Sequence, residues 1–209
     1  MRSVLAFGDS NTWGLVPGSA DMERYPPDVR WTGVLQRTCR GILVIEEGLC
    51  GRTTVFEDAL RPGRKGVSAL PGILARCRPL DAAILMLGTN DCKSRYGASP
   101  LTIGRGIEAC LDELKAYRPA DRVLLVSPLL LGEDVWRPDK DPEFDRRSVA
   151  VCRALKEVYA RIAGERGCAF LAASDFASAH HADDEHMDAG GHRLFAAAVC
   201  GKLAEMGVI

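Results

Sequence analysis

The chain has 209 residues with 27 basic and 28 acidic side chains, which gives a formal net charge of -1. Such a balance gives no indication of a nucleic-acid or membrane-surface partner, and no apolar stretch approaches the ~20 residues that cross a bilayer. The length and ordinary composition favour one globular domain, residues 1–209, with a sizeable core. The first predicted strand starts almost at Met1, which leaves no room for a signal peptide and favours a cytoplasmic location.

Cysteines are spread along the chain without a Cys-x-x-Cys pair, so the sequence contains no recognised zinc or redox motif. In a cytoplasmic protein we expect most of them to be buried, reduced thiols that pack as small apolar side chains. The eight are Cys39, Cys50, Cys77, Cys92, Cys110, Cys152, Cys168 and Cys200.

Short apolar runs bounded by turn-forming residues have the length and composition of buried strands. In chain order they are Val4–Phe7, Ile42–Ile45, Ala82–Leu87, Val123–Val126 and Ala169–Leu171. Apolar side chains at helical spacing predict a helix after each run. The first of these helices is separated from its strand by a proline-rich loop. These helices lie at about Arg30–Gly41, Leu70–Cys77, Ile103–Leu114, Val151–Ile162 and around Phe195–Leu203.

Strands and helices therefore alternate about five times along the chain. This alternation predicts an α/β fold in which helices cover both faces of a five-stranded parallel sheet, joined by right-handed crossovers. The nearly continuous apolar character of the strands agrees with burial on both faces.

Polar residues follow the first predicted strand at once. The strand stops at Gly8, and Asp9, Ser10 and Asn11 come next. A serine just beyond the carboxyl end of a strand lies where open parallel sheets place their ligands. Taken alone, such a serine is more often a helix N-cap than a nucleophile, because a nucleophilic serine needs a base and a group that orients the base.

The other end of the chain offers both groups. Asp183 precedes His186 by three residues, a spacing that lets one loop hold a carboxylate against the imidazole. Our central hypothesis is that Ser10, His186 and Asp183 form a hydrolytic triad. Asp184 is an alternative orienting residue, although it lies only two residues from His186 and has a less comfortable reach around the ring.

At this point the sequence resembles a known family. Gly8–Asn11 resembles the first block of the SGNH hydrolases, also called GDSL-type esterases, and Gly88–Asp91 is similar to their Gly-x-Asn-Asp block. Gly48–Thr53 lies where a glycine block is expected between them, and Asp183-x-x-His186 resembles the last block. Each block alone is a weak signal, but the four in family order are a specific one.

Two further stretches, Pro27–Leu35 and Glu46–Leu49, resemble the bacterial arylesterase/acyltransferase branch of this family. One departure is Asn11, which stands where the family's name has leucine. The resemblance implies a three-layer α/β/α sandwich with the flavodoxin-like strand order 2-1-3-4-5. All four blocks then fall at one end of the sheet.

The chemistry expected of these blocks is ester hydrolysis without a cofactor or metal. Ser10 attacks, His186 moves the proton, and the N–H groups of Ser10 and Gly51 with the side-chain amide of Asn90 bind the oxyanion. We expect structural roles for Asp9 and Asp91 in fixing their loops.

Apolar residues near the nucleophile are candidates for the substrate pocket: Trp13, Leu15, Val16 and Trp136. The loops 14–29 and 128–143 are long for a compact domain, and such loops are usually functional. We expect them to shape the pocket and a subunit interface, because the branch that the chain resembles includes homo-oligomers.

A metal site is the main rival from the residues themselves. All four histidines lie near the C-terminus among acidic residues, a patch of imidazoles and carboxylates that suits zinc or manganese. No recognised spacing such as His-Glu-x-x-His occurs, so we assign no metal ligand. We place His192 on a helix surface and His180 and His181 in a solvated loop. A cysteine nucleophile, Cys50 or Cys92 served by His186, is a smaller rival.

The sequence thus predicts a serine carboxylic-ester hydrolase that cleaves small acyl esters of aryl or alkyl alcohols through an acyl-enzyme. Acyl transfer to alcohols or peroxide is expected if the pocket excludes enough water. The alternatives are an O-deacetylase of a sugar or other metabolite with the same triad, a metal-dependent hydrolase and a binding protein without turnover. The expected partner is a small ester substrate, with no nucleic acid and no membrane.

Overall fold

A computed structural model describes residues 1–77, 79–117 and 120–209. Within these ranges five parallel strands form one sheet in the order β2-β1-β3-β4-β5, which confirms the predicted fold. The strands are β1 (Arg2–Gly8), β2 (Ile42–Gly48), β3 (Ala82–Met86), β4 (Val123–Ser127) and β5 (Ala169–Ala172).

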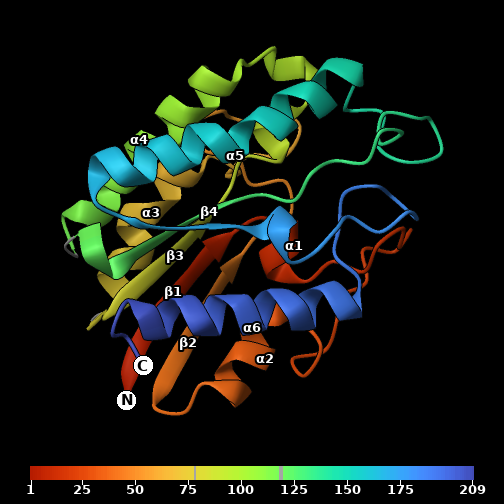
Figure 1. Cartoon of the computed structure of the whole chain (residues 1–209). Helices are drawn as coiled ribbons and strands as arrows, with labels where there is room; N and C mark the ends of the chain where they lie inside the picture. The colour runs from red at the N-terminus through yellow and green to blue at the C-terminus, as the bar shows by residue number, and fades with distance from the viewer. Residues whose placement is uncertain (78, 118–119) are drawn as a thin grey trace.

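Helices cover both faces of the sheet and make three layers (Figure 1). One face carries α2 (Trp31–Thr38) and α6 (Ala189–Glu205). The other face carries α3 (Gly66–Arg76), α4 (Pro100–Lys115) and α5 (Arg146–Arg166). Side chains alternate between the two faces along each strand, so the strands contribute to a hydrophobic core on each face of the sheet. In β1, Leu5 and Phe7 pack toward α3–α5, whereas Val4 and Ala6 pack toward α2 and α6.

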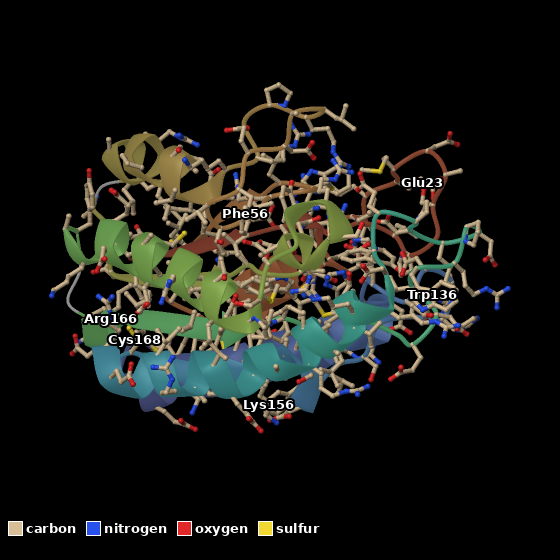
Figure 2. The ribbon with its side chains drawn as sticks, turned by 90° about the horizontal axis from the view of Figure 1, so that it is seen from above. Glu23, Phe56, Trp136, Lys156, Arg166 and Cys168 are labelled. Atoms are coloured by element: carbon tan, nitrogen blue, oxygen red, sulfur yellow. A yellow bond between two sulfur atoms is a disulfide. The ribbon has the colours of Figure 1, made fainter. Side chains whose placement is uncertain are left out.

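Short helical turns follow three of the strands at their carboxyl ends. They are α1 (Ser10–Trp13) after β1, η1 (Asn90–Cys92) after β3 and η4 (Ala173–Asp175) after β5. Two others, η2 (Ser94–Tyr96) and η3 (Ala120–Arg122), precede α4 and β4. The loops that carry Glu23 and Trp136 lie together at one end of the molecule, opposite the end that carries Arg166 and Cys168 (Figure 2).

The second strand departs from the prediction of a buried run. β2 is an edge strand, and Leu43 is 47% exposed. Only the ladder to β1 and the helices beside it cover this strand, and its later residues, including Glu46 and Glu47, are half-buried. An edge position cannot be read from apolar content alone, because it depends on where the chain places its neighbours.

The cysteines also differ in part from the expectation of reduced thiols. Cys39 and Cys200 are paired as a disulfide, with their Cα atoms 6.4 Å apart. The bond joins the end of α2 to α6 across 161 residues of sequence. The other six cysteines are free thiols, and four of them are buried.

Phe195 gives a test of the α2–α6 core. Its ring is fully buried and packs edge-on against Trp31, with ring centroids 5.2 Å apart. Phe195→Ala is expected to lower the free energy of unfolding by ~3–5 kcal/mol, because it leaves a cavity in this core. Urea titration measures the loss. The matched control is Leu194→Ala on the next residue, which is 56% exposed and should change stability by under ~0.5 kcal/mol. Equal losses for both variants would contradict this packing.

Candidate active site

The carboxyl end of β1 positions Ser10. Gly8 is the last strand residue, and a Cβ there would lie 2.1 Å from Oγ1 of Thr12, so only glycine fits this sharp exit from the strand. Asp9 then caps α1, with its Oδ1 accepting the N–H of Asn11 at 3.0 Å. The result is a buried serine at the first position of a short helix, at the end of a central strand.

His186 reaches Ser10 from 176 residues away in the sequence. Its Nε2 lies 2.8 Å from Ser10 Oγ, and its Nδ1 lies 2.8 Å from Asp183 Oδ2. Both distances are those of good hydrogen bonds. The structure therefore brings together the three residues that the sequence predicted for a triad, in the order nucleophile, base and orienting carboxylate.

Asn11 holds the histidine loop against the serine. Its Nδ2 donates to the carbonyl of Glu185 at 3.2 Å, and its Oδ1 accepts the N–H of Met187 at 3.0 Å. These two residues flank His186, so the amide beside Ser10 fixes the backbone on both sides of the imidazole. Sequence reasoning treated Asn11 only as a departure from the family's name. Its side-chain role depends on a contact across the chain that no local signal shows.

Asp183 is held as a hydrogen-bond acceptor on both oxygens. Oδ1 accepts the backbone N–H groups of Glu185 and His186, each at 3.0 Å, and Oδ2 also accepts the N–H of Gly18 at 2.9 Å. Burial alone would raise the pKa of Asp183, but its bonds with His186 outweigh burial and lower the pKa to about 2. The carboxylate is therefore ionised where it faces the imidazole.

The alternative orienting residue, Asp184, points elsewhere. Its carboxylate pairs with Lys140, and its carbonyl accepts the N–H of Gly132 at 2.8 Å. Asp184 has a φ of 59°, a left-handed conformation that is uncommon for a residue with a side chain. A Cβ on Gly132 would lie 2.2 Å from Cγ of Asp184, so the two loops pack in direct contact.

Ion pairs hold the 128–145 loop to the neighbouring loops. Glu143 pairs with Arg61, Lys93 and Arg95, which come from two other segments of the chain. Lys93 also lies 3.5 Å from Asp141. The long loop is therefore fixed on one side by Glu143 and on the other by Asp184.

Three carboxylates influence His186. Burial would lower the pKa of His186, but the negative charges of Glu185, Asp183 and Asp9 outweigh it and raise the pKa to about 9. Of these, Glu185 lies beside Nε2, with its Oε1 3.8 Å from that nitrogen. Burial raises the pKa of both Asp9 and Glu185. The site is thus arranged to stabilise a protonated imidazole.

The predicted oxyanion donors come from three loops. Gly51 has a φ of 80°, a conformation that favours glycine. Among the described residues, no acceptor is bonded to the backbone N–H of Ser10 or of Gly51. Asn90 is buried, and one of its amide protons goes to the carbonyl of Arg52 at 3.2 Å, so the other is available. Their role in binding an oxyanion stays a prediction.

Arg52 is a structural residue that sequence reasoning did not single out. Its Nη1 donates to the carbonyl of Gly8 at 2.8 Å and to that of Glu47, so it ties the carboxyl ends of β1 and β2 together. Its guanidinium also lies over the ring of Phe7, 4.3 Å from the centroid. Burial lowers the pKa of Arg52 to about 10.

Asp91 fixes η1 against the loop after β2. Its carboxylate accepts the backbone N–H and the hydroxyl of Thr54, with N···O distances of 3.0 and 3.1 Å. These bonds agree with the structural role expected for Asp91. Burial raises the pKa of Asp91 to about 6.

His192 is not on a helix surface, contrary to the prediction. It is fully buried, its Nδ1 accepts the N–H of Trp31 at 3.2 Å, and its ring packs edge-on against Tyr25. Burial lowers the pKa of His192 to about 4, so it is a neutral ring between α6 and α2. Phe195, Val199 and Leu203 are buried as predicted, and His192 lies three residues before Phe195 on the same face of the helix.

The rival chemistries find little support in the geometry. Across residues 1–77, 79–117 and 120–209, no three His, Cys, Asp or Glu side chains converge as ligands for one metal ion. Burial raises the pKa of Cys50 to about 11, and the pKa of Cys92 is also raised, by its contact with Cys152 and by burial. A thiol of raised pKa is a poor nucleophile, because it is the thiolate that reacts.

Of the four pocket candidates, Trp13 is the last residue of α1, and Leu15, Val16 and Trp136 lie on the loops. Trp13 is half-buried under the guanidinium of Arg24, 5.1 Å from its ring centroid. Leu15 is buried and Val16 half-buried, and the indole N–H of Trp136 donates to its own loop at Glu133. Their contact with an acyl or aryl group stays a prediction. A hollow of about 640 Å³ beside His180, His181 and the start of α6 is lined by none of the triad residues.

Among the described residues, no helix combines the length and the apolar character needed to cross a membrane. The serine loop and the histidine loop meet at the carboxyl ends of the strands, where open α/β sheets place their sites.

Comparisons with known proteins agree with this geometry. Residues 6–194 match the model of the GDSL-like lipase/acylhydrolase family. The search of curated proteins found no match to this chain. Among solved structures, the aryl esterase of M. smegmatis is 34% identical with a TM-score of 0.89, and the alignment covers 99% of this chain and 100% of that one.

Two structures from Sinorhizobium meliloti are also similar. Est24, a carbohydrate acetylesterase, is 33% identical with a TM-score of 0.87, over 99% of this chain and 100% of that one. A second carbohydrate acetylesterase family member is 29% identical with a TM-score of 0.89, over the whole of both chains. With the family match spanning most of its length, the chain belongs to the GDSL-like lipase/acylhydrolase family of SGNH hydrolases and is a carboxylic-ester hydrolase.

Proposed function

We propose that the protein cleaves small acyl esters with a Ser10-His186-Asp183 triad through an acyl-enzyme. The observation that carries this proposal is a pair of 2.8 Å contacts, one from Ser10 Oγ to the His186 ring and one from that ring to Asp183. The same arrangement of hydroxyl, imidazole and carboxylate activates serine on several unrelated folds.

Acylation uses the triad and the oxyanion donors together. His186 Nε2 takes the proton of Ser10 as Oγ attacks the acyl carbon, and Asp183 stabilises the resulting imidazolium. The carbonyl oxygen becomes negative and is bound by the N–H groups of Ser10 and Gly51 with the amide of Asn90. His186 then gives its proton to the alcohol oxygen as the carbon–oxygen bond breaks, which leaves the acyl group on Ser10.

Deacylation repeats these steps with water as the attacking group. His186 takes a proton from water, the tetrahedral intermediate collapses, and the proton returns to Ser10 as the acid leaves. An alcohol or peroxide in place of water would give acyl transfer with the same residues. None of these steps uses a cofactor.

The alcohol part of the ester is the open question. One similar structure is an aryl esterase and another a carbohydrate acetylesterase, so both an aryl ester and an acetylated sugar are candidate substrates for this chain. The expected self-association stays a prediction that a solution mass by light scattering tests, and the cytoplasmic location stays one that cell fractionation tests.

Serine-directed labelling tests the triad. A fluorophosphonate probe should label Ser10, and Ser10→Ala should abolish labelling and lower turnover of p-nitrophenyl acetate by ~10⁴-fold or more. Ser178→Ala, an exposed serine in the loop before His186, is the control and should keep full activity. Chelator should leave the wild type unaffected. Chelator-sensitive turnover, or full activity in Ser10→Ala, would reject the triad.

Asn90→Ala tests the oxyanion site. Removal of one oxyanion donor typically costs ~10²–10³ in turnover, so we expect a fall of ~100-fold or more in kcat for p-nitrophenyl acetate. Circular dichroism should show the native fold, because Asn90 contributes only one described side-chain bond to the structure, to the carbonyl of Arg52. A change of less than ~3-fold would remove Asn90 from the site.

The pH profile tests the electrostatics of His186. Only neutral imidazole can accept the Ser10 proton, so kcat/KM should fall as the pH falls through the pKa of His186. Because that pKa is raised, the midpoint of the acidic limb should lie above the ordinary value of ~6.5. Initial rates on p-nitrophenyl acetate from about pH 5 to 10, corrected for spontaneous hydrolysis, give the midpoint. A midpoint at or below ~6.5 would contradict this assignment.

A further inference from the structure

Glu185 is a carboxylate that the proposed triad does not use. It lies in the sequence between Asp183 and His186, and its side chain is only 7% exposed. Its Oε1 lies 3.8 Å from His186 Nε2, the same nitrogen that contacts Ser10 Oγ. Asp183 contacts the opposite nitrogen of the ring. Glu185 therefore lies on the reacting side of the imidazole.

The backbone of Glu185 is fixed, but its carboxyl group is not satisfied. Its N–H donates to Asp183, and its carbonyl accepts the amide of Asn11. The carboxyl group accepts no hydrogen bond from any residue that the structure describes. The carboxyl oxygens are also absent from the fully enclosed side-chain atoms that lack a partner, so they still reach the surface beside the reacting nitrogen. A carboxyl group that is open there and unbonded to the protein can accept a hydrogen bond from a ligand.

The charged neighbours of Glu185 do not provide its carboxyl group with a hydrogen-bond partner. Lys93 is the nearby cation, but its ammonium group is held by Glu143 and Asp141. The other charges that influence Glu185 are those of His186, Asp141 and Asp183. The carboxylate of Glu185 can therefore accept a hydrogen bond from a substrate group that lies beside His186 Nε2.

We propose that Glu185 is a specificity-determining residue that binds a free hydroxyl on the alcohol part of the ester, next to the bond that is cleaved. The substrate class is then acyl esters of polyhydroxylated alcohols, of which partly acetylated sugars are one kind. This inference rests on the proposed function, because it takes His186 as the group that protonates the leaving alcohol.

Geometry places the hydroxyl on the alcohol side. To receive its proton, the leaving oxygen must come within about 3 Å of His186 Nε2. Glu185 Oε1 is 3.8 Å from that same nitrogen, so it borders the leaving oxygen and its nearest substituents. A hydroxyl on the adjacent carbon of the alcohol is therefore the group within its reach. The three proposed oxyanion donors come from other loops and face the acyl carbonyl instead.

A hydroxyl fits this position better than a cation does. His186 becomes positively charged as Ser10 attacks, and its Nε2 lies beside the proposed binding position. A substrate ammonium held there would be repelled by the imidazolium in the transition state. A neutral hydroxyl carries no such penalty and can donate a hydrogen bond to the carboxylate of Glu185.

A matched pair of substrates tests the proposal. Glycerol 1-acetate and propyl acetate share an acetyl group and a three-carbon alcohol, and only the first has a hydroxyl beside the ester oxygen. The wild type should have a kcat/KM at least about tenfold higher for glycerol 1-acetate, as one hydrogen bond to a buried partner allows. Absence of this preference in the wild type overturns the proposal, whatever the variants do.

Variants then assign the preference to Glu185. Glu185→Leu should lower kcat/KM for glycerol 1-acetate about tenfold or more and change that for propyl acetate less than about threefold. Glu185→Gln, which keeps a donor and an acceptor, should retain most of the preference. The control is Glu157→Leu, an exposed acid on α5 outside both long loops, which should change kcat/KM for neither substrate.

The other outcomes each have one meaning. Equal losses on both substrates in Glu185→Leu show that Glu185 acts only through His186, and they overturn the proposal. A preference for acetylcholine over glycerol 1-acetate that disappears in Glu185→Leu also overturns it, in favour of a cation site. If the wild type cleaves p-nitrophenyl acetate and is labelled at Ser10 but shows no hydroxyl preference, only this inference fails. If Ser10 is not labelled and no ester is cleaved, the proposed function itself fails.

Discussion

The two hydrogen bonds between the Asn11 side chain and the histidine loop are the contact on which the site depends. Asn11 follows Ser10 directly, and it bonds the backbone on both sides of His186. A hydroxyl and an imidazole from opposite ends of the chain thereby meet at 2.8 Å. The parallel sheet makes this meeting feasible, because it brings the carboxyl ends of all its strands to one edge. The side-chain amide of Asn11 then fixes the position of the His186 backbone relative to Ser10.

The carboxylates around His186 favour the protonated form of its ring. Asp183 faces Nδ1 and Glu185 borders Nε2, while Asp9, the N-cap of α1, adds a third negative charge. Together they favour a protonated imidazole, which in the proposed mechanism is the state that forms as serine attacks. The same charges raise the pKa of His186. One arrangement thus links the stabilisation of a protonated ring to the pH at which the ring loses its proton.

Sequence patterns predicted most of the fold and the three residues of the candidate triad. The strands were visible because central parallel strands are apolar on both faces, and β1, β3 and β4 are almost wholly buried. Ser10, Asp183 and His186 were visible because their spacing and chain order carry the chemistry. Features that depend on residues far away in the sequence could not be predicted from it. The edge position of β2, the burial of His192 and the pairing of Cys39 with Cys200 all depend on how layers dock.

Asp184 joins the catalytic segment to a loop that begins more than forty positions earlier, through its pairing with Lys140 and its packing on Gly132. That loop is in turn secured by Glu143. A redesign of residues 128–145 that removes Gly132 or Lys140 would therefore also loosen the segment that carries Asp183 and His186. A transplanted loop needs both residues to hold that segment where it is.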